Sequence, residues 1–513
     1  MLFDKVLLVL WLMFWKVESR KEFLVAESAN MDLMQLDGEL IDSLMSYADK
    51  IDQKVSKLKR LFYNRLAQEL RQPLEAAKGR EEEYLGNPLH SFPLIRHMYQ
   101  DWQYLAEFMK KPVGEEEIGF LRKKLPELPW QAETEEATVY IFRIAETHGM
   151  MPWEMANGLI DNVRLNSTLS ALDCFEVAKL YFKWGYFKQA LQWISISKTR
   201  LQEEYSGVYE VLGMSGQDVA LLQARCLVEL DLRDVALELL VKQPDLAEHS
   251  TSWLDQFEAY PHMTVDSPPT LGEDFKRLCR SSFSPKPSKL HCRYNSTTSP
   301  FLILAPLKME QISLEPYIVV YHDILPEGDI HQLIALAEPR LRATLAFTED
   351  KSDSVFGAFL PFKDMNSSGE PVLDRLTQRM RDITGLQIHQ RNRINIIKYG
   401  FGAHYAARHD FFNETNSETE GYGDRMATVM FYLNDAPNGG ATVFPRINVK
   451  VPAERGKVLF WYNLDGETHD VDPKTVHAAC PVFHGSKWVM AAWIHEYDQM
   501  FIQPIYREGK MKH

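Results

Sequence analysis

The hydrophobic pattern of the chain changes its period near residue 300, and this change limits the fold more than any other feature. Upstream, apolar residues recur every three or four positions, which is the spacing of an amphipathic helix. From Phe301 onward they gather in short runs, rich in β-branched and aromatic residues and separated by Gly, Asn and Asp, as in strands. The runs are YIVVYHDIL, RINIIKYG, ATVMFYLN, ATVFP, GKVLFWYN and KWVMAAWIHEY. Many strands with few helices predict a sandwich or jelly-roll barrel.

The first residues are typical of a secretory signal peptide. Residues 6–15 are an apolar run that follows Lys5 and is too short to span a bilayer. A buried N-terminal helix is the alternative, but no amphipathic face is visible. No later run is long enough for a membrane span. The net charge of −14 argues against nucleic acid or an anionic membrane as the main partner.

In a secreted protein, sequons can be glycosylated and cysteines can form disulfides. Four N-x-S/T sequons are candidates for glycosylation: Asn166, Asn295, Asn366 and Asn413. Cys279 and Cys292 flank a short loop and are the expected disulfide. Cys174 and Cys226 fall in helical patterns and are expected in the core, whereas Cys480 has no obvious partner.

Residues 31–102 carry a helical pattern. The apolar stripe consists of Leu40, Leu44, Tyr47, Ile51, Val55, Leu58, Phe62 and Leu66. Charged residues lie between them, so the stripe needs a partner helix. A dimerising coiled coil with a second copy and a helical hairpin within one chain both remain open.

Residues 170–245 hold an internal repeat. Ala178 and Ala190 are 12 residues apart, and Ala224 and Ala236 repeat that spacing. Small residues at this separation let two antiparallel helices approach closely, as in tetratricopeptide pairs. The first pair is rich in aromatic residues, which predicts either core and interface packing or a groove for an extended, proline-rich peptide. The candidate peptide-binding residues are Tyr181, Trp184, Tyr186 and Trp193.

The last strands carry residues suited to metal chemistry. His477, Lys487 and His495 follow one another at intervals of ten and eight residues. A jelly roll with a His/Asp pair on one strand and a histidine on a distant strand can hold non-haem Fe(II) through two histidines and a carboxylate. A neighbouring lysine would then bind the carboxylate of an anionic co-substrate.

Several long segments resemble the α subunits of collagen prolyl 4-hydroxylase. Those in the C-terminal half are TGLQIHQRNRINIIKYGFGAHY, FYLNDAPNGGATVFP, GKVLFWYNL and HAACPVFHGSKWVMAAWIHE. Those in the N-terminal half are NPLHSFPLIRHMYQDW and LDCFEVAKLYF. The resemblance covers nearly the whole chain after the signal peptide.

The resemblance implies an Fe(II)- and 2-oxoglutarate-dependent dioxygenase of the endoplasmic-reticulum lumen that uses ascorbate to keep its iron reduced. Its substrates would be prolines in X-Pro-Gly repeats of procollagen. Its partners would be a second α subunit and protein disulfide isomerase as the β subunit. The expected organisation is a multidomain α+β protein that ends in a double-stranded β-helix (jelly-roll) domain. Its parts are a signal peptide (1–19), a helical dimerisation region (20–140), a tetratricopeptide-like peptide-binding domain (141–245), a linker (246–300) and the dioxygenase domain (301–513).

The resemblance also assigns roles to single residues. Asp410 and His477 match iron ligands, Lys487 matches the lysine that binds the far carboxylate of the co-substrate, and His495 matches a histidine that assists its binding. The family places its first iron histidine two residues before the aspartate, but this chain has Arg408 there.

Arg408 makes iron binding doubtful. Side chains at i and i+2 of a strand share a face, so His409 points away from Asp410 unless a bulge re-aims it. Arginine has no lone pair for a metal and could pair with Asp410 instead. In one alternative a local bulge turns His409 toward the iron and the enzyme remains active. In the other, the site holds no metal and the chain is a non-catalytic relative that binds collagen-like peptides or partner subunits. An oxygenase for another secreted substrate is a third possibility.

A second departure concerns a cysteine. The family has a cysteine near its C-terminus that pairs with the match of Cys480, but this chain has Ile505 there. The resemblance therefore implies that Cys480 is a buried or free thiol.

Overall fold

The computed structural model describes most of the chain between residues 27 and 499. The described residues are 27–63, 71, 75, 77–80, 88–160, 163–203, 206–260, 262, 268, 271–280, 289–345, 354–361, 370–388, 393–412, 419–436, 438–465, 470–483 and 485–499. The expected signal peptide, the sequons at Asn366 and Asn413, and Ile505 lie outside them. The chain divides into two compact units, residues 28–130 and residues 131–513 together with 1–27. No helix in the described ranges is long and apolar enough to cross a membrane.

The smaller unit is helical, as its sequence predicts. Its helices are α2 (Glu27–Leu61), α5 (Pro88–Arg96), α6 (Trp102–Lys110) and α7 (Glu115–Lys124). Lys50 of α2 pairs with Glu116 and Glu117 of α7 at 3.2 and 2.6 Å. Gly114 has a positive φ and lies against Tyr47 so closely that any Cβ would meet the ring. The long helix therefore has a partner within its own chain. Several of its apolar side chains nevertheless stay exposed: Met31, Met34, Ile41, Leu44 and Met45.

The larger unit begins with helices that pack in consecutive pairs. They are α8 (Gln131–His148), α9 (Pro152–Ala156), α10 (Ala171–Lys183), α11 (Phe187–Glu203), α12 (Ser206–Val211), α13 (Gly216–Glu229), α14 (Arg233–Val241) and α15 (Ser250–Ala259). A short hairpin of β1 (Leu159–Ile160) and β2 (Val163–Arg164) precedes α10. Helices α10 and α13 both start with a capping box, from Ser170 and Ser215 respectively. The four alanines of the sequence repeat are all buried where the paired helices meet, as that spacing predicts: Ala178, Ala190, Ala224 and Ala236.

The aromatic residues of the first helix pair lie mostly in the core. Tyr181, Trp184 and Trp193 are buried, whereas Tyr186 and Phe187 are partly exposed. Phe142 of α8 packs between them, with ring centroids 5.7 Å from Tyr181, 5.8 Å from Trp184 and 5.0 Å from Tyr186. Of the candidate peptide-binding residues, Tyr186 therefore presents the most accessible ring.

The C-terminal half consists of antiparallel sheets, and each β-rich run named above contains a strand. The strands are β3 (Cys292–Asn295), β4 (Leu307–Leu314), β5 (Tyr317–His322), β6 (Arg342–Leu345), β7 (Ser354–Pro361), β8 (Arg393–Tyr399), β9 (Tyr405–Arg408), β10 (Arg425–Tyr432), β11 (Thr442–Phe444), β12 (Val449–Val451), β13 (Val458–Tyr462), β14 (His477–Ala479) and β15 (Lys487–His495). The larger sheet has the order β3-β4-β5-β13-β10-β15-β8-β7-β6, and the smaller one has the order β12-β11-β14-β9. The helices of this half are α16 (Glu273–Arg280), α17 (Glu327–Ala337), α18 (Pro371–Thr384) and α19 (Thr419–Tyr422).

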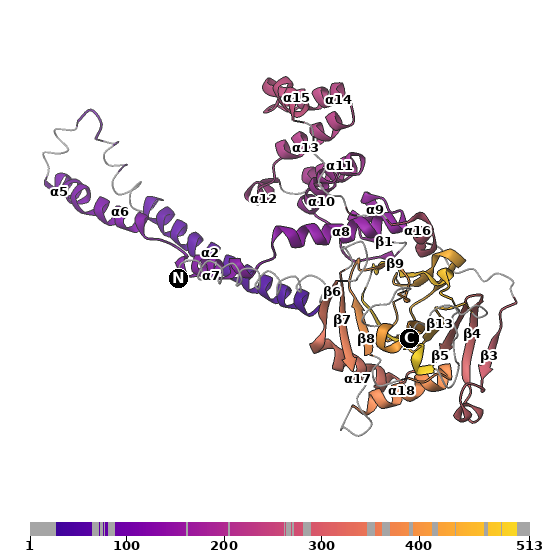
Figure 1. Ribbon diagram of the computed structural model, residues 1–513. Helices are drawn as coiled ribbons and strands as arrows, with labels where there is room; N and C mark the ends of the chain where they lie inside the picture. The colour runs from indigo at the N-terminus through magenta and orange to yellow at the C-terminus, as the bar shows by residue number, and fades with distance from the viewer. Residues whose placement is uncertain are drawn as a thin grey trace, which may run out of the picture. The chain divides into compact units, whose positions relative to one another are not determined.

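The two faces of the larger sheet are covered differently (Figure 1). On β10, Val429 and Phe431 point into a core shared with α17 and α18. Met430 and Tyr432 point the other way, into a second core that also contains Phe444 of the smaller sheet. Alternation along one buried strand thus supplies two cores. The space between the two sheets is where the candidate site lies.

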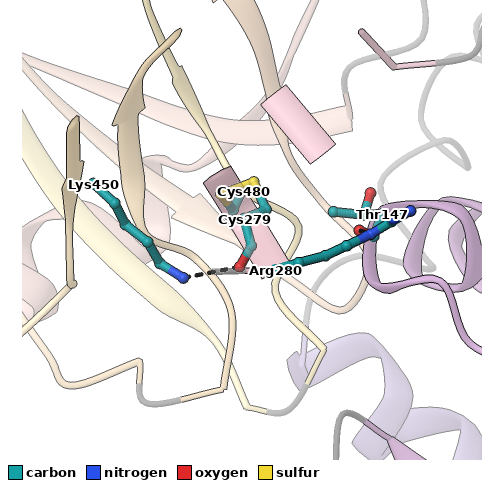
Figure 2. The surroundings of a disulfide bond; sticks show 5 residues. All are labelled: Thr147, Cys279, Arg280, Lys450 and Cys480. Carbon is teal, nitrogen blue, oxygen red and sulfur yellow. Dashed lines mark hydrogen bonds between the residues drawn. A yellow bond between two sulfur atoms is a disulfide. The ribbon is translucent and has the colours of Figure 1, made fainter. Parts of the chain in front are cut away.

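The disulfide differs from the prediction. Cys279 of α16 pairs with Cys480, just after β14 (Figure 2). Cys292 is an exposed free thiol. Both expectations, a Cys279–Cys292 bridge and an unpaired Cys480, are therefore wrong. The reason is tertiary, because Leu278 of α16 and Ala478 of β14 belong to one buried apolar cluster, which also contains the two cysteines, 201 positions apart in sequence. Cys174 and Cys226 are buried and free, as predicted.

Helix α16 also ties the helical layer to the sheets. Lys276 forms an ion pair with Glu146 of α8 at 3.1 Å. The Arg280 guanidinium donates to the carbonyl oxygen of Thr147, close to the C-terminus of α8 (Figure 2). On the other side Lys450 of β12 donates to the carbonyl of Cys279 at 2.8 Å. The disulfide therefore reinforces a helix that already joins two layers.

Removing the disulfide is expected to destabilise the protein. A cross-link over 201 residues restricts the unfolded chain strongly, so Cys480→Ser should lower the free energy of unfolding by about 3–5 kcal/mol. Urea denaturation under non-reducing conditions measures the change. Cys292→Ser is the matched control and should change the midpoint little, because that thiol is exposed. Equal destabilisation by both substitutions would contradict the assigned pairing.

The described sequons differ in access. Asn166 is exposed in the loop after β2. Asn295 is buried, and its Nδ2 donates hydrogen bonds to Thr298 Oγ1 at 2.9 Å and to the Tyr321 hydroxyl at 3.1 Å. A glycan on that nitrogen would break these hydrogen bonds of Asn295. Asn166 is therefore the more accessible glycosylation candidate of the two.

Candidate functional site

The candidate site lies where β9 and β14 of the smaller sheet run antiparallel. Arg408 stands directly opposite His477 in this pairing, and Asp410 follows two residues later. Asp410 and His477 are buried, and His477 Nε2 lies 3.5 Å from Asp410 Oδ1. The structure thus brings together two residues that are 67 positions apart in sequence.

His477 is oriented by its surroundings. Its Nδ1 lies 3.1 Å from the carbonyl oxygen of Thr475, which favours a proton on Nδ1 and leaves the lone pair on Nε2. The rings of Trp461 and Phe444 flank the imidazole at centroid distances of 4.8 and 5.8 Å. The free nitrogen therefore faces Asp410.

A hydrogen-bond chain holds the Asp410 carboxylate. Thr428 of β10 donates to Asp410 Oδ2 at 2.7 Å. Asn463 Nδ2 donates to Thr428 Oγ1 at 3.2 Å, and Trp461 Nε1 donates to Asn463 Oδ1 at 2.8 Å. Sequence reasoning did not single out Thr428 or Asn463. The sequence did offer a signal for each. Thr428 is a polar residue inside a largely apolar strand, and Asn463 is a polar residue that directly follows the apolar strand β13.

Arg408 occupies the same face as Asp410, as the strand spacing predicts. Its Nε lies 4.0 Å from Asp410 Oδ1. The guanidinium stacks over the Tyr405 ring, with Cζ 3.4 Å from the ring centroid. Its Nη1 is buried and has no hydrogen-bond partner among the described residues. A positive charge therefore lies beside the carboxylate where the family would place a histidine.

His409 points away from this group. It is exposed, and its ring lies against Phe411 at a centroid distance of 4.5 Å. Partial burial and the nearby Arg446 charge lower the pKa of His409. The strand does contain an irregularity, but it lies between Tyr405 and Arg408 and does not turn His409 inward. Over the described ranges, no three His, Cys, Asp or Glu side chains come close enough to hold a metal ion.

Lys487 and His495 lie at opposite ends of β15. Lys487 is buried, with its Nζ 4.9 Å from the ring centroid of Tyr399 and 5.7 Å from that of Tyr432. His495 lies eight residues on, about 26 Å away along an extended strand, and its Nδ1 is 3.1 Å from the carbonyl of Gly423. The structure therefore does not bring His495 to Lys487.

Burial and neighbouring charges set the protonation of the site. Burial alone raises the pKa of Asp410, but the charges of His477 and Arg408 and the Thr428 hydrogen bond outweigh it and hold that pKa below its usual value. Burial lowers the pKa of His477 to about 4, against the opposing pull of Asp410. Burial, with repulsion from Arg408, lowers the pKa of Lys487 to about 7. At neutral pH the site holds an ionised Asp410 beside a neutral His477.

These residues do not fit Fe(II). A three-ligand iron site needs two imidazoles and a carboxylate on one metal, and Asp410 and His477 supply only one of each. Arg408 cannot complete the set, because its guanidinium stays protonated and has no lone pair. Its charge also repels a divalent cation next to Asp410.

Comparison with known proteins identifies the family of this chain. Residues 26–162 match the family described as "Prolyl 4-Hydroxylase alpha-subunit, N-terminal region", and residues 394–495 match the 2OG-Fe(II) oxygenase superfamily. Prolyl 4-hydroxylase subunit alpha-1 of Mus musculus is 30% identical over 511 residues, which cover 92% of this chain and 93% of the relative. The Homo sapiens subunit alpha-1 is 28% identical over 505 residues, with the same coverage of both chains.

Two further comparisons are more distant. Prolyl 4-hydroxylase subunit alpha-2 of Caenorhabditis elegans is 27% identical over 454 residues, covering 82% of this chain and 83% of the relative. The solved viral collagen prolyl hydroxylase of Paramecium Bursaria Chlorella virus-1, in complex with 2OG, has 20% identity and a TM-score of 0.29; the match covers 35% of this chain and 95% of the viral one. The resemblance stated from sequence motifs is therefore confirmed by the whole-length relatives. This chain belongs to the prolyl 4-hydroxylase α-subunit family and carries a domain of the 2OG-Fe(II) oxygenase superfamily.

Proposed function

We propose that this chain is a prolyl 4-hydroxylase-type α subunit that binds collagen-like, proline-rich peptides and does not itself catalyse iron-dependent hydroxylation. The observation that carries the proposal is Arg408, whose guanidinium lies 4.0 Å from the Asp410 carboxylate. A histidine at position 408 would lie beside Asp410 and His477 and could bind a metal with them. The arginine that stands there places a cation beside the carboxylate and cannot act as a ligand.

The peptide-binding part of the proposal rests on the helix pairs. Helices α10 and α11 form a hairpin whose alanines are buried, which supports a tetratricopeptide-like domain in this region. Tyr186 lies in the turn between them, partly exposed and stacked near Phe142. A partly exposed aromatic ring beside a rigid aromatic core suits a proline ring. The buried rings beneath Tyr186 would support this surface from the core side; they are Tyr181, Trp184 and Trp193.

The wider setting follows the family resemblance. We assign residues 301–513 to a double-stranded β-helix, since the two sheets enclose a shared core. The segment 246–300, expected as a linker, instead holds α15, α16 and β3, which pack on the neighbouring layers. The exposed apolar residues of α2 would dimerise with a second α subunit. Protein disulfide isomerase would be the β subunit, and the assembly would reside in the endoplasmic-reticulum lumen. Iron and ascorbate would serve only an active partner chain.

A turnover assay tests the loss of chemistry. The full chain, supplied with Fe(II), 2-oxoglutarate, ascorbate and a (Pro-Pro-Gly)-type peptide, should decarboxylate 2-oxoglutarate no faster than its Asp410→Ala variant. Peptide binding, measured by fluorescence anisotropy, should be equal in the two proteins. Turnover well above that of the variant would refute the proposal.

A second measurement tests the peptide surface. Tyr186→Ala should weaken peptide binding at least tenfold, because it removes the accessible ring. Tyr260→Ala is the matched control, since Tyr260 is exposed at the end of α15. If Tyr186→Ala binds peptide as well as Tyr260→Ala does, the peptide does not use this surface.

An active dioxygenase is the second candidate function. It is favoured by the orientation of His477 Nε2 toward Asp410 and by the Thr428 hydrogen bond, both of which suit a metal centre. It requires His409 to turn inward when iron binds. The turnover assay separates this candidate from the first.

A further inference from the structure

Helix α8 lies between the helical layer and the sheets, and its opposite sides pack on different layers (Figure 1). Phe142 belongs to the buried core of the helical layer, where its ring centroid lies 5.0 Å from that of Tyr186. Tyr140 stands two positions earlier, which places it about 200° around the helix, on the other side. It is 4% exposed. A single helix therefore carries a contact to the proposed peptide surface and a separate buried contact on its far side.

The far side of α8 touches the segment that leads into strand β9. Gly402 has a φ of +69°, and a Cβ on it would lie within 2.9 Å of Tyr140 Cα and closer still to Tyr140 Cβ. These atoms belong to or adjoin the backbone of α8, so no rotation of a side chain relieves the clash, and only glycine fits. Gly402 donates to the carbonyl of Val482 at 2.6 Å, and Val482 donates to the carbonyl of Ala403 at 3.2 Å. Helix α8 thus lies against the start of the strand that ends at Arg408.

A second contact joins the same two layers. Phe483 follows strand β14 of the smaller sheet, yet its buried side chain belongs to the apolar core of the helical layer. Its ring centroid lies 4.7 Å from that of His148, the last residue of α8. Phe483 comes directly after Val482, so one short segment contacts both the end of α8 and the start of β9.

From these contacts we infer that α8 couples the surface around Tyr186 to strand β9, with Tyr140 and Gly402 as the positioning residues at the far end. The inference rests on the proposed peptide surface and goes beyond it, because it states how a peptide on Tyr186 changes the stability of β9. Close-packed groups do not yield independently, so ordering one side of α8 restrains the other. By linkage the effect is reciprocal, and loosening β9 must weaken peptide binding by the same factor.

Hydrogen–deuterium exchange of the full chain, with and without a saturating (Pro-Pro-Gly)-type peptide, tests the coupling. Short exchange times are used, because they report local opening and not global unfolding. Amides in residues 403–408 should exchange at least threefold more slowly in the complex. Helix α17 is the internal reference, since it packs on the other face of the larger sheet and its exchange should not change. Equal slowing in α17 and in residues 403–408 would refute a specific path through α8.

Variants identify the contact that carries the coupling. Gly402→Ala should abolish the slowing in residues 403–408 and weaken peptide affinity at least threefold. Gly456→Ala is the matched control, because Gly456 also has a positive φ, +80°, but a Cβ there would meet only the carbonyl of Leu325, at 3.4 Å. Phe483→Leu is a second, milder variant that removes the ring beside His148 and should at least halve the slowing. Thermal melting of each variant shows whether its fold is retained.

The outcomes separate this inference from the proposed function. If the peptide binds and exchange in residues 403–408 does not change, the inference is overturned and the proposed function stands. If no peptide binds, the proposed function fails, and the variants alone decide the coupling. Gly402→Ala should then speed exchange in residues 181–187 at least threefold more than Gly456→Ala does. Equal exchange there in the two variants would overturn the inference as well.

Discussion

Arg408→His is expected to create an Fe(II) site in this chain and to raise peptide-dependent decarboxylation of 2-oxoglutarate from background to a readily measured rate. The physical reason is that the side chain at 408 lies beside Asp410, with Arg408 Nε 4.0 Å from the carboxylate, and that this residue stands opposite His477. Those two residues are already oriented, with His477 Nε2 3.5 Å from the carboxylate. A histidine would supply the third ligand and remove the competing cation in a single change.

The size of the effect follows from the ligand count. Loss of a residue that only hydrogen-bonds to a metal ligand costs about 10–100-fold in metal affinity. Gain of a histidine that binds the metal directly should therefore tighten Fe(II) binding by at least as much. Fe(II) affinity is measured by competition with a chelator, alongside the turnover assay. Arg408→Ala is the matched control, because it removes the charge without adding a ligand. If Arg408→Ala gains as much as Arg408→His, the charge and not the missing ligand limits the site.

Binding of 2-oxoglutarate to Lys487, the role that the family resemblance gives this lysine, should weaken by about tenfold for each pH unit above pH 7, which is the second large effect. The carboxylate needs a protonated Lys487, and burial has lowered the pKa of this lysine to about 7. Below pH 7 the ammonium is already present, so affinity should level off. Above it, binding must take up a proton, and each unit costs a factor of ten until the pKa of the bound state is reached.

Burial raises the pKa of Tyr432, whose ring lies beside Lys487, above its usual value. The measurement is calorimetry in buffers with different ionisation enthalpies, which reports proton uptake directly. Lys487→Arg keeps its charge throughout and should give a flat profile. Affinity that does not change between pH 6 and pH 9 in the unaltered chain would contradict the role given to Lys487.

Much of the architecture could be predicted from local pattern. The strand runs after Phe301 and the alanine spacing in residues 170–245 depend on which faces of single elements are buried, and a sequence records this directly. The sequence also predicts which of the side chains at 408, 409 and 410 lie on the same side. Alternation along a strand placed Arg408 with Asp410 and turned His409 away, as the structure shows.

What the sequence could not determine depends on pairings between distant elements. The partner of Cys279 is one example, because proximity in sequence favoured Cys292, whereas the buried cluster that α16 shares with residues of the smaller sheet contains Cys480. The support of Asp410 by Thr428 and Asn463 is another, since it joins three strands or strand ends.

By itself, therefore, the sequence determined the family, the succession of helices and sheets, and the replacement of an iron histidine by Arg408. Only the tertiary structure decided what surrounds that replacement. It stacked the guanidinium on Tyr405 beside Asp410, buried Lys487 beside the rings of Tyr399 and Tyr432, and left His495 at the far end of its strand. The physical reason is that strand alternation is a local property, whereas the register between sheets, which decides what meets across the core, is fixed by packing along the whole chain.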